Sequence, residues 1–430
     1  MTDYDFYLGE EYALKLDAAD PLTPYRKRFY EIPGKIYMDG NSLGLLSIDS
    51  ERALERVLSE WKQLGIAGWW EAKIPWINYA ERLGSMMAPI IGARSDEVVV
   101  TGGTTVNLHA LASTFYQPES GRTKILADEL NFPSDLYALQ SQIVLKGLDP
   151  SKELLLVKSR CGNLIEEEDI IREMGDDISL AVLPSVYYRS GQLLDMSLLT
   201  KKAHERGIII GFDLAHSIGV IPHKLAEWDV DFAFWCNYKY MNGGPGATGG
   251  LYVNRRHFGK RPALAGWFGN ERSSMFDMNI YFKPAESASA WQIGTTTMLS
   301  SAPIEGSVRL VREAGIHNIR EKSRKITSYL IFLVDELLGK KPYSFGVASP
   351  RDPDRRGGHV GVTHKEAWRI NQALIARGVI PDFRPPDIIR LAPIPLYISY
   401  HDVWSVVHHI RSVIDDKEYL EFSDERSTIT

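Results

Sequence analysis

The amino-acid sequence predicts an α/β fold built around a mainly parallel sheet with helices on both faces. Two patterns carry this prediction. Short aliphatic and β-branched runs alternate with longer amphipathic stretches through the middle of the chain, and Gly or Pro commonly separates the two. Alternation of this kind is typical of strand–helix units whose strands lie parallel in one sheet. We therefore expect a ligand site outside the carboxyl ends of the strands.

The middle of the chain, residues 98–240, supplies the expected sheet. Amphipathic helical patterns lie between its first strands, at residues 106–116 and 134–145. The strands themselves are expected at residues 98–100, 124–127, 154–157, 180–183, 208–212 and 231–240.

The C-terminal part of the chain has a different, α+β pattern. Long helical periodicity covers residues 304–338, and a loop rich in Pro, Gly and Arg follows at 349–359. A helix at 365–378, a strand-like run at 388–397 and a last helix at 402–414 complete the pattern. These elements predict a second, smaller domain.

The length of 430 residues also predicts two lobes, because one hydrophobic core rarely serves a chain of this size. We expect a large domain over 61–310 and a small α+β domain over 311–430. Residues 1–60 are expected to form an N-terminal segment that packs with the small domain.

Composition and charge exclude several classes of protein. The hydrophobic fraction of 44% is ordinary for a soluble protein, and the net charge of −6 without a long basic run argues against nucleic acid as a partner. Two cysteines, Cys161 and Cys236, cannot build a disulfide scaffold or a four-Cys zinc site, and we expect no metal. An acidic start without an apolar segment and the lack of a membrane-length apolar run predict a cytoplasmic protein.

Asp213 and Lys239 form the sharpest chemical pattern in the chain. Asp213 lies where an expected strand ends, and Lys239 lies 26 positions later (239 − 213), near the end of the next strand-like run. An enzyme that uses pyridoxal 5′-phosphate (PLP) needs a Lys amine to hold the cofactor aldehyde and a carboxylate to keep its pyridinium nitrogen protonated. The same pair is also compatible with an Asp that caps a turn and a Lys that extends into solvent.

The residues around this pair resemble the PLP signature of the kynureninase family, of fold type I and class V. The resemblance covers nearly the whole chain and is much more specific than any single motif. It implies a large PLP domain with a seven-stranded type of sheet and a smaller α+β domain. The matching segments include 37–44, 104–108, 132–135, 213–216, 235–246, 266–269, 350–353, 356–360 and 390–397.

The resemblance implies a role for each matching residue near the cofactor. Lys239 is implied to bind PLP and to take the Cα proton, Asp213 to pair with the pyridinium nitrogen, and Tyr238 to bind phosphate and relay a proton. Thr104 and Thr105 match phosphate contacts at the start of a helix, where free N–H groups favour an anion. The remaining cofactor contacts implied by the family are Phe132, Asp135, His216, Trp267 and Thr295. Helix capping or core packing is the structural alternative for several of them.

The resemblance also implies a homodimer and a substrate side of the site. In the family, Trp267 and Thr295 match residues supplied by the neighbouring subunit, so the active sites are expected to be shared. Arg390 matches the Arg that binds the substrate α-carboxylate, a task that suits its planar fork of donors. The other substrate-binding candidates are Asn41, Ser42, Leu64 and Ile66.

Departures from the family pattern cluster at the substrate side. Leu64 and Ile66 stand where bacterial-type and animal-type members have Trp and His, respectively. Pro184 replaces a Ser or Thr, with Ser185 next to it, and Thr296-Thr297 replaces two prolines. Because polar groups in a site decide which analogues it rejects, these changes leave a different substrate open.

The reaction implied by the resemblance is hydrolysis of kynurenine, or of a similar γ-keto amino acid, to alanine and an aryl carboxylate such as anthranilate. The alternative is another PLP-dependent lyase, oxidase or biosynthetic enzyme that acts on a different amino acid. A cysteine desulfurase is disfavoured, because it needs a nucleophilic Cys after the Lys and no Cys follows Cys236. A cofactor-binding protein without turnover would not need Lys239, Asp213 and Arg390 together.

Overall fold

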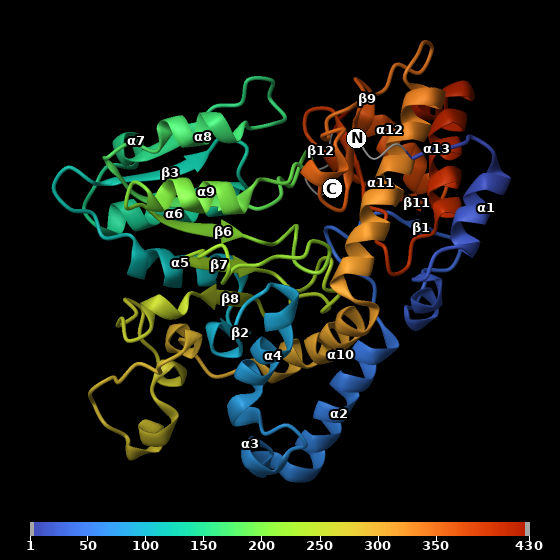
Figure 1. The fold of residues 1–430 in the computed structure, drawn as a ribbon. Coiled ribbons are helices and arrows are strands. Elements are labelled where there is room, and N and C mark those ends of the chain that lie inside the picture. Colours follow the sequence, from blue (N-terminus) through green and yellow to red (C-terminus); the bar gives the residue numbers. More distant parts are fainter. Residues whose placement is uncertain (1–3, 426–430) are drawn as a thin grey trace.

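A seven-stranded sheet forms the centre of the computed structural model, which describes residues 4–425 (Figure 1). The strand order is β2-β8-β7-β6-β5-β3-β4. Strands β3 to β7 pair in parallel, and β8 pairs antiparallel with both β7 and β2. The prediction of a mainly parallel α/β sheet is therefore confirmed. The strands are β2 (Val98–Val99), β3 (Lys124–Asp128), β4 (Leu154–Val157), β5 (Ile178–Pro184), β6 (Ile209–Asp213), β7 (Phe232–Trp235) and β8 (Gly250–Val253).

Both faces of this sheet are buried, which explains the continuous apolar runs in the sequence. Along β3, Ile125 and Ala127 pack in one core cluster while Leu126 packs in the other. Helices α5 (Thr104–Phe115) and α6 (Pro133–Leu145) supply the first cluster, and α8 (Glu167–Glu173) and α9 (Met196–His204) contribute to the second. Because β3 to β7 run parallel, their carboxyl ends meet at one common edge of the sheet. The other short helices of this region are α3 (Gly68–Glu71), α4 (Tyr79–Met87) and α7 (Pro150–Glu153).

The C-terminal part of the chain forms a second, four-stranded antiparallel sheet in the order β12-β13-β10-β9. Figure 1 shows it at the upper right, beside helices α11, α12 and α13. A two-stranded parallel sheet joins β1 (Ile36–Tyr37), from the N-terminal segment, to β11 (Val379–Ile380). The strands and helices of this part are β9 (Gly346–Val347), β10 (Val360–Thr363), β12 (Asp382–Arg384), β13 (Ile388–Leu391), α11 (Ile316–Leu338), α12 (Ala367–Ala376) and α13 (Tyr400–Asp415).

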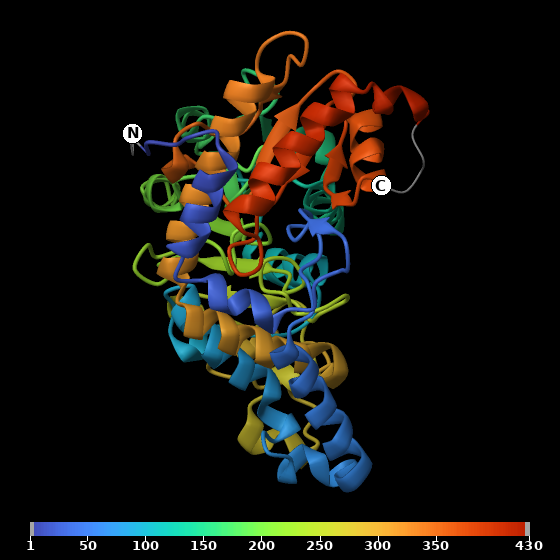
Figure 2. The same cartoon turned by 90° about the vertical axis from the view of Figure 1, so that its right-hand side faces the viewer.

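Three further helices, two from the N-terminal segment and one between the two sheets in sequence, pack beside these elements. Figure 2 shows α1 (Glu10–Ala18) beside α13 and the long α2 (Ile48–Leu64) alongside α10 (Met298–Ala314). Gly315, at φ 80°, separates α10 from α11, so the long periodic stretch is two helices rather than one. No helix within residues 4–425 combines the length and apolarity that crossing a membrane requires.

Candidate active site

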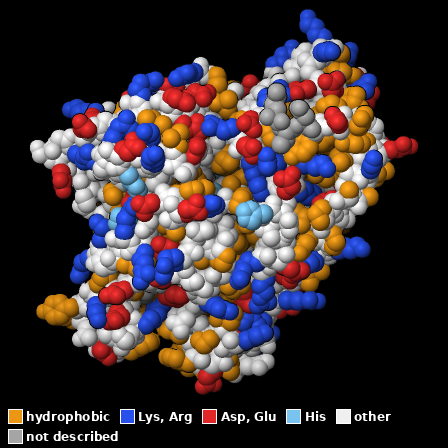
Figure 3. Space-filling model, in the orientation of Figure 1, with side chains coloured by type: hydrophobic (Ala, Val, Ile, Leu, Met, Phe, Trp, Pro, Cys, Tyr) orange, Lys and Arg blue, Asp and Glu red, His pale blue; other side chains and the backbone are white. Residues whose placement is uncertain are grey.

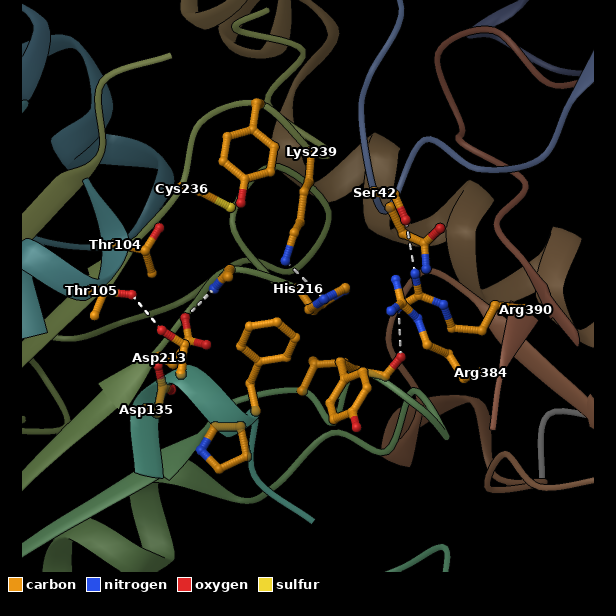
Figure 4. Close-up of a pocket in the computed structure, with 18 of the residues that line it drawn as sticks. Ser42, Thr104, Thr105, Asp135, Asp213, His216, Cys236, Lys239, Arg384 and Arg390 are labelled. Carbon is orange, nitrogen blue, oxygen red and sulfur yellow. Dashed lines mark hydrogen bonds between the residues drawn. The ribbon is translucent and has the colours of Figure 1, made fainter. Parts of the chain in front are cut away.

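A cavity of about 230 Å³ opens at the carboxyl ends of the central strands, where the large sheet meets the small antiparallel sheet (Figure 4). Pro184 and Asp213 are the last residues of β5 and β6, and Cys236 directly follows β7. Arg384 and Arg390 reach the cavity from β12 and β13. The site therefore lies where the parallel sheet predicts it, and residues far apart in the sequence form its walls.

Lys239 projects into this cavity from the turn after β7, which ends at Trp235, five residues before the end of the strand-like run at 231–240. Lys239 Nζ lies 2.9 Å from His216 Nε2. His216 is buried, and both burial and the charge of Lys239 hold its pKa well below the ordinary value. The neutral imidazole can therefore accept a hydrogen bond from the Lys239 amine.

Two buried carboxyl groups, Asp213 and Asp135, also line the cavity. Asp213 Oδ1 accepts a hydrogen bond of 2.7 Å from the Ala215 N–H. Burial raises the pKa of both carboxyl groups, and the negative charge of Asp213 adds to the increase at Asp135. Within residues 4–425, Asp135 Oδ2 has no hydrogen-bond partner, although Asp135 is only 1% exposed. Such an oxygen is expected to be satisfied by a bound cationic or N–H group.

The N-terminus of α5 supplies an anion-binding edge to the same cavity. Thr104 and Thr105 are its first two residues, and the first N–H groups of a helix have no acceptor inside the helix. Thr105 Oγ1 and Ser134 Oγ hydrogen-bond to each other at 2.7 Å, so hydroxyl groups from α5 and α6 face one another. Phe132, directly before α6, lines the cavity and remains 42% exposed, so it is not the ordinary core residue that packing would predict.

Arg390 occupies the end of the cavity nearest the small sheet. Its Nε donates to Asp382 Oδ2 at 2.5 Å, and its two Nη atoms donate to the Tyr188 carbonyl and to Ser42 Oγ, both at 2.8 Å. The side chain is 1% exposed, and burial lowers its pKa. An arginine held on three sides presents its remaining N–H groups in a fixed direction, as recognition of a carboxylate requires.

Tyr238 and Cys236 lie next to Lys239 in the wall of the cavity. Burial raises the pKa of both the Tyr238 phenol and the Cys236 thiol, so both are neutral at pH 7. Cys236 is 2% exposed, as expected for a residue packed after a strand. Both polar atoms of the buried Asn41 side chain have no partner within the described chain, and Asn41 also lines the cavity.

Most of the residues named from the sequence come together here. They come from six separate stretches of the chain. Those that line the cavity are Asn41, Ser42, Thr104, Thr105, Phe132, Asp135, Asp213, His216, Tyr238, Lys239 and Arg390.

Four predicted positions lie elsewhere in a single chain. Leu64 is the last residue of α2, and Ile66 after it is 74% exposed. Trp267 is 48% exposed, and Thr295 lines a separate cavity beside the outer side of α5. At the position of the expected Ser or Thr, Pro184 lines the main cavity, and the neighbouring Ser185 hydroxyl donates instead to the Asp213 carbonyl at 2.8 Å.

Several cavity residues were not identified from the sequence. Ser134 lies inside a segment that matches the family, but nothing in its position next to Asp135 marked it as a cavity residue. Arg384 gave no signal in the sequence, because no strand was expected at 382–384; it lies two residues after Asp382 and shares its face of β12. The others are Leu130, Val186, Tyr188 and Ala215.

This set of groups fits PLP. A lysine amine, a buried carboxyl oxygen that lacks a partner and a helix N-terminus with two hydroxyl groups meet in one cavity. These are the groups that an aldehyde, a pyridinium N–H and a phosphate require, respectively.

Comparison with known proteins adds a family to this geometry. Residues 319–410 match the family model described as "Kynureninase C-terminal domain". A kynureninase of Geobacillus thermodenitrificans is 56% identical over 419 residues, which are 97% of each chain. A kynureninase of Shouchella clausii is 53% identical over 429 residues and covers 100% of both chains.

Solved structures with the same fold are much more distant in sequence. An apo cysteine desulfurase from Thermococcus onnurineus superimposes with a TM-score of 0.78 at 18% identity, covering 91% of this chain and 98% of that one. A mutant of C-DES with glycine covalently linked to its PLP cofactor gives a TM-score of 0.77 at 16% identity, covering 90% and 98%. At this identity the likeness establishes the fold alone.

Proposed function

The chain belongs to the kynureninase family, and on that basis we propose that it is a PLP-dependent hydrolase of kynurenine or a similar γ-keto amino acid. The products are alanine and an aryl carboxylate such as anthranilate. The observation that carries the proposal is the single cavity in which Lys239, Asp213 and Arg390 meet. Those three groups can bind an aldehyde cofactor, stabilise its ring cation and hold an amino-acid carboxylate.

The cofactor is assigned to one end of the cavity. Lys239 would bind PLP covalently, Asp213 and Asp135 would face its pyridinium nitrogen, and Thr104 with Thr105 would bind its phosphate. Phe132 lines the cavity with its ring exposed and would stack on the cofactor ring. When bound, PLP supplies the electron sink that makes removal of the substrate Cα proton feasible.

The chain's own residues would bind the substrate and move its protons. Arg390, fixed by Asp382 and Ser42, would hold the α-carboxylate and so orient the Cα–H bond. Lys239 would take the Cα proton, since its amine lies in the same cavity as Arg390. Tyr238 has a raised pKa and is therefore a neutral phenol, which can donate a proton near the bond that breaks.

The assembly that we propose is a homodimer with shared active sites. Trp267 and Thr295 would then complete the cavity of the partner subunit. Hydrophobic side chains of the 276–281 segment, including Ile280 at 89% and Tyr281 at 82% exposure, support a contact surface there. Figure 3 shows hydrophobic side chains protruding at the lower left, where Figure 1 draws this segment.

We further propose the division of the chain into residues 1–60, 61–310 and 311–430. The N-terminal segment would then belong with the small domain, and the pairing of β1 with β11 supports this. A cytoplasmic location is also proposed, since Cys161 and Cys236 are both free thiols, which suits a reducing compartment.

The test is turnover by the purified, PLP-loaded protein. We expect equal amounts of anthranilate and alanine from kynurenine, complete loss of both with Lys239→Ala, and unchanged turnover with Lys201→Ala on the exposed surface of α9. Binding of PLP through Lys239 without cleavage of kynurenine or 3-hydroxykynurenine would contradict the proposed reaction. It would favour the alternative, another PLP-dependent lyase, oxidase or biosynthetic enzyme.

A further inference from the structure

Two arginine side chains share one carboxylate oxygen at the wall of the cavity. Asp382 Oδ2 accepts hydrogen bonds from Arg390 Nε at 2.5 Å and from Arg384 Nε at 2.9 Å. Asp382 lies directly opposite Arg390 in the antiparallel register, and Arg384 follows two residues later on the same face of β12. Figure 4 shows the two guanidinium groups side by side, opposite Asp213 and Asp135.

The two arginines differ in how many of their donors are used. Arg390 has a protein acceptor at each of its three nitrogens. Arg384 uses only Nε, and neither of its Nη atoms has an acceptor among residues 4–425. A guanidinium carries five N–H groups, so Arg384 retains about four that the protein leaves for a ligand or for solvent.

The charge around the pair also favours an anion. Two guanidinium groups face the one carboxylate of Asp382, which leaves an excess positive charge in a largely buried wall. Asp39 is the other acidic group near the pair, and burial and the charge of Asp382 raise its pKa to about 6, so Asp39 is mostly ionised at pH 7 and the excess positive charge is largest below pH 6. An excess charge in a low-dielectric wall binds an opposite charge strongly.

We propose that Arg384 is a second substrate-binding arginine, which together with Arg390 holds the α-carboxylate and so selects amino acids over simple amines. Asp382 is a positioning residue that fixes the Nε edge of each guanidinium and directs the Nη groups into the cavity. The inference deepens the proposed function and rests on it, since it takes the substrate to be an α-amino acid.

A purely structural role for Arg384 is the competing explanation. Its guanidinium lies over the Tyr188 ring, 6.0 Å from the centroid, and the ion pair with Asp382 contributes to packing. Those contacts use the face of the group and its Nε alone. If Arg384 served only these packing contacts, its replacement would weaken the binding of all ligands equally. A direct contact with the substrate carboxylate would instead affect only ligands that carry a carboxylate.

The test compares two ligands that differ only in the carboxylate. L-Alanine and L-alaninamide are titrated into the PLP-loaded protein, and the dissociation constants are obtained from the change in cofactor absorbance. The variants are Arg384→Met and Arg384→Lys, and the control is Arg377→Met, which removes a surface ion pair with Glu418 in the same part of the fold. Because hydrogen bonds to charged groups are strong, we expect Arg384→Met to weaken L-alanine binding by about tenfold or more while L-alaninamide changes by less than about threefold.

Other outcomes overturn the inference. Equal weakening of both ligands in Arg384→Met indicates a structural role, and unchanged L-alanine binding removes Arg384 from the site. If Arg384→Met does not fold, Arg384→Lys decides the question. Lysine keeps the positive charge but lacks the planar fork of donors, so this variant should show a smaller preference for L-alanine over L-alaninamide than the wild type does. Failure of the wild type to cleave kynurenine would contradict the proposed reaction without affecting this comparison, which measures binding only.

Discussion

Lys239 Nζ lies 2.9 Å from His216 Nε2, so the residue proposed to bind the cofactor already has a hydrogen-bond acceptor in the cavity wall. The other ring nitrogen, His216 Nδ1, has no partner within the described residues. Burial and the nearby Lys239 lower the pKa of His216, which keeps the imidazole neutral. The contact therefore orients the lysine amine without adding a positive charge beside it.

Replacing His216 by Phe should slow the reaction without preventing attachment of PLP. The ring would fill the same space, but Lys239 would lose its acceptor and its amine would be less well aligned with the Cα proton. We expect kcat/KM to fall about 10- to 100-fold. Steady-state kinetics and the cofactor spectrum measure the two effects separately.

The pH profile sharpens this test. Because its pKa is lowered, wild-type His216 should not titrate between pH 6 and 9, and the shape of the rate profile should be the same in His216→Phe. His317→Gln, on the exposed side of α11, is the matched control and should keep full activity. A limb of the profile that disappears in His216→Phe would show that the imidazole does titrate in this range.

Asp135→Asn should stabilise the apo-protein while impairing the PLP-loaded one. Burial and Asp213 raise the pKa of Asp135 above its ordinary value of 3.8, so the folded state takes up a proton that the unfolded state releases. The apo-protein consequently loses stability as pH rises from about 4 through the higher folded-state pKa. Asn removes this penalty, and we expect the apo Tm at pH 8 to rise by about 2 °C.

The control for Asp135 is the pH at which the melting is measured. At pH 4 the wild-type carboxyl group is largely protonated in the folded state, so the two proteins should then melt at similar temperatures. A lower Tm for Asp135→Asn at pH 8 would mean that the ionised carboxylate stabilises the apo-protein through a contact that Asn cannot make.

Binding of carboxylate ligands should depend on the protonation of Asp39. Burial and the charge of Asp382 raise its pKa to about 6, while a hydrogen bond with Ser42 and the charges of Arg390 and Arg384 act in the opposite direction. Below pH 6 the protonated group no longer repels a substrate carboxylate, so affinity should increase as pH falls from 7 to 5.5. The ratio of the L-alanine dissociation constants of wild type and Asp39→Asn isolates this effect, because other titrations are common to both proteins.

Asp39→Asn should bind L-alanine about threefold to tenfold more tightly than the wild type at pH 7.5, and the difference should diminish towards pH 5. L-Alaninamide lacks the charge and should show a much smaller difference. A ratio that does not change with pH would place the Asp39 carboxylate too far from the ligand to matter.

A buried ionic network far from the cavity should control stability but not catalysis. Burial opposes ionisation of Asp231, yet hydrogen bonds from His204, His257 and the Ile210 N–H, with the charge of Arg256, lower its pKa. Its stabilisation is present above about pH 4 and is lost as pH falls further. We expect Asp231→Asn to lower the free energy of unfolding by about 3 kcal/mol, because it leaves partners of a buried charge unsatisfied. Denaturant unfolding checks this, and kcat/KM of the folded fraction should be unchanged.

The strands of the sheet could be predicted because the apolar runs that specify them are local in the sequence. A run such as residues 180–183 is apolar on both faces, and the strand indeed packs in two cores. The end of β7 was less predictable, since the apolar run continues past Trp235 although the backbone turns there. Tertiary contacts, including the hydrogen bond from Gly44 N–H to the Tyr238 carbonyl, hold that turn, and no local pattern reports them.

The residues of the candidate site likewise fall into those that the sequence predicts and those that only the fold brings into place. Asp213 and Lys239 stand at strand ends and carry a recognisable spacing, whereas Arg384 acquires its place only when β12 pairs with β13. Its partner Asp382 lies only two residues earlier in the sequence, but the sharing of one Asp382 oxygen with Arg390 depends on the register of β12 and β13. Leu64, Ile66, Trp267 and Thr295 lie outside the cavity of one chain, and the roles proposed for Trp267 and Thr295 depend on a second subunit.

Complementation between two inactive variants would test the shared active site. Lys239→Ala removes the lysine proposed to bind PLP, and Thr295→Asp would place a negative charge where the cofactor phosphate in the partner's cavity is proposed to bind. In a mixed dimer with shared sites, both defects fall in one cavity and the other cavity is native. Co-expression should therefore restore about a quarter of wild-type activity, because about half of the dimers are mixed and each has one good site.

The matched control combines Lys239→Ala with Asp213→Asn. Both residues line the cavity of their own chain, so every cavity in the mixed dimer carries one defect and activity should stay absent. Thr295 is exposed and lines a separate cavity in its own chain, which is why its contribution should be to the other subunit. If Lys239→Ala with Thr295→Asp also gives no recovery although mixed dimers form, Thr295 acts within its own chain and the sharing of sites through this residue is wrong.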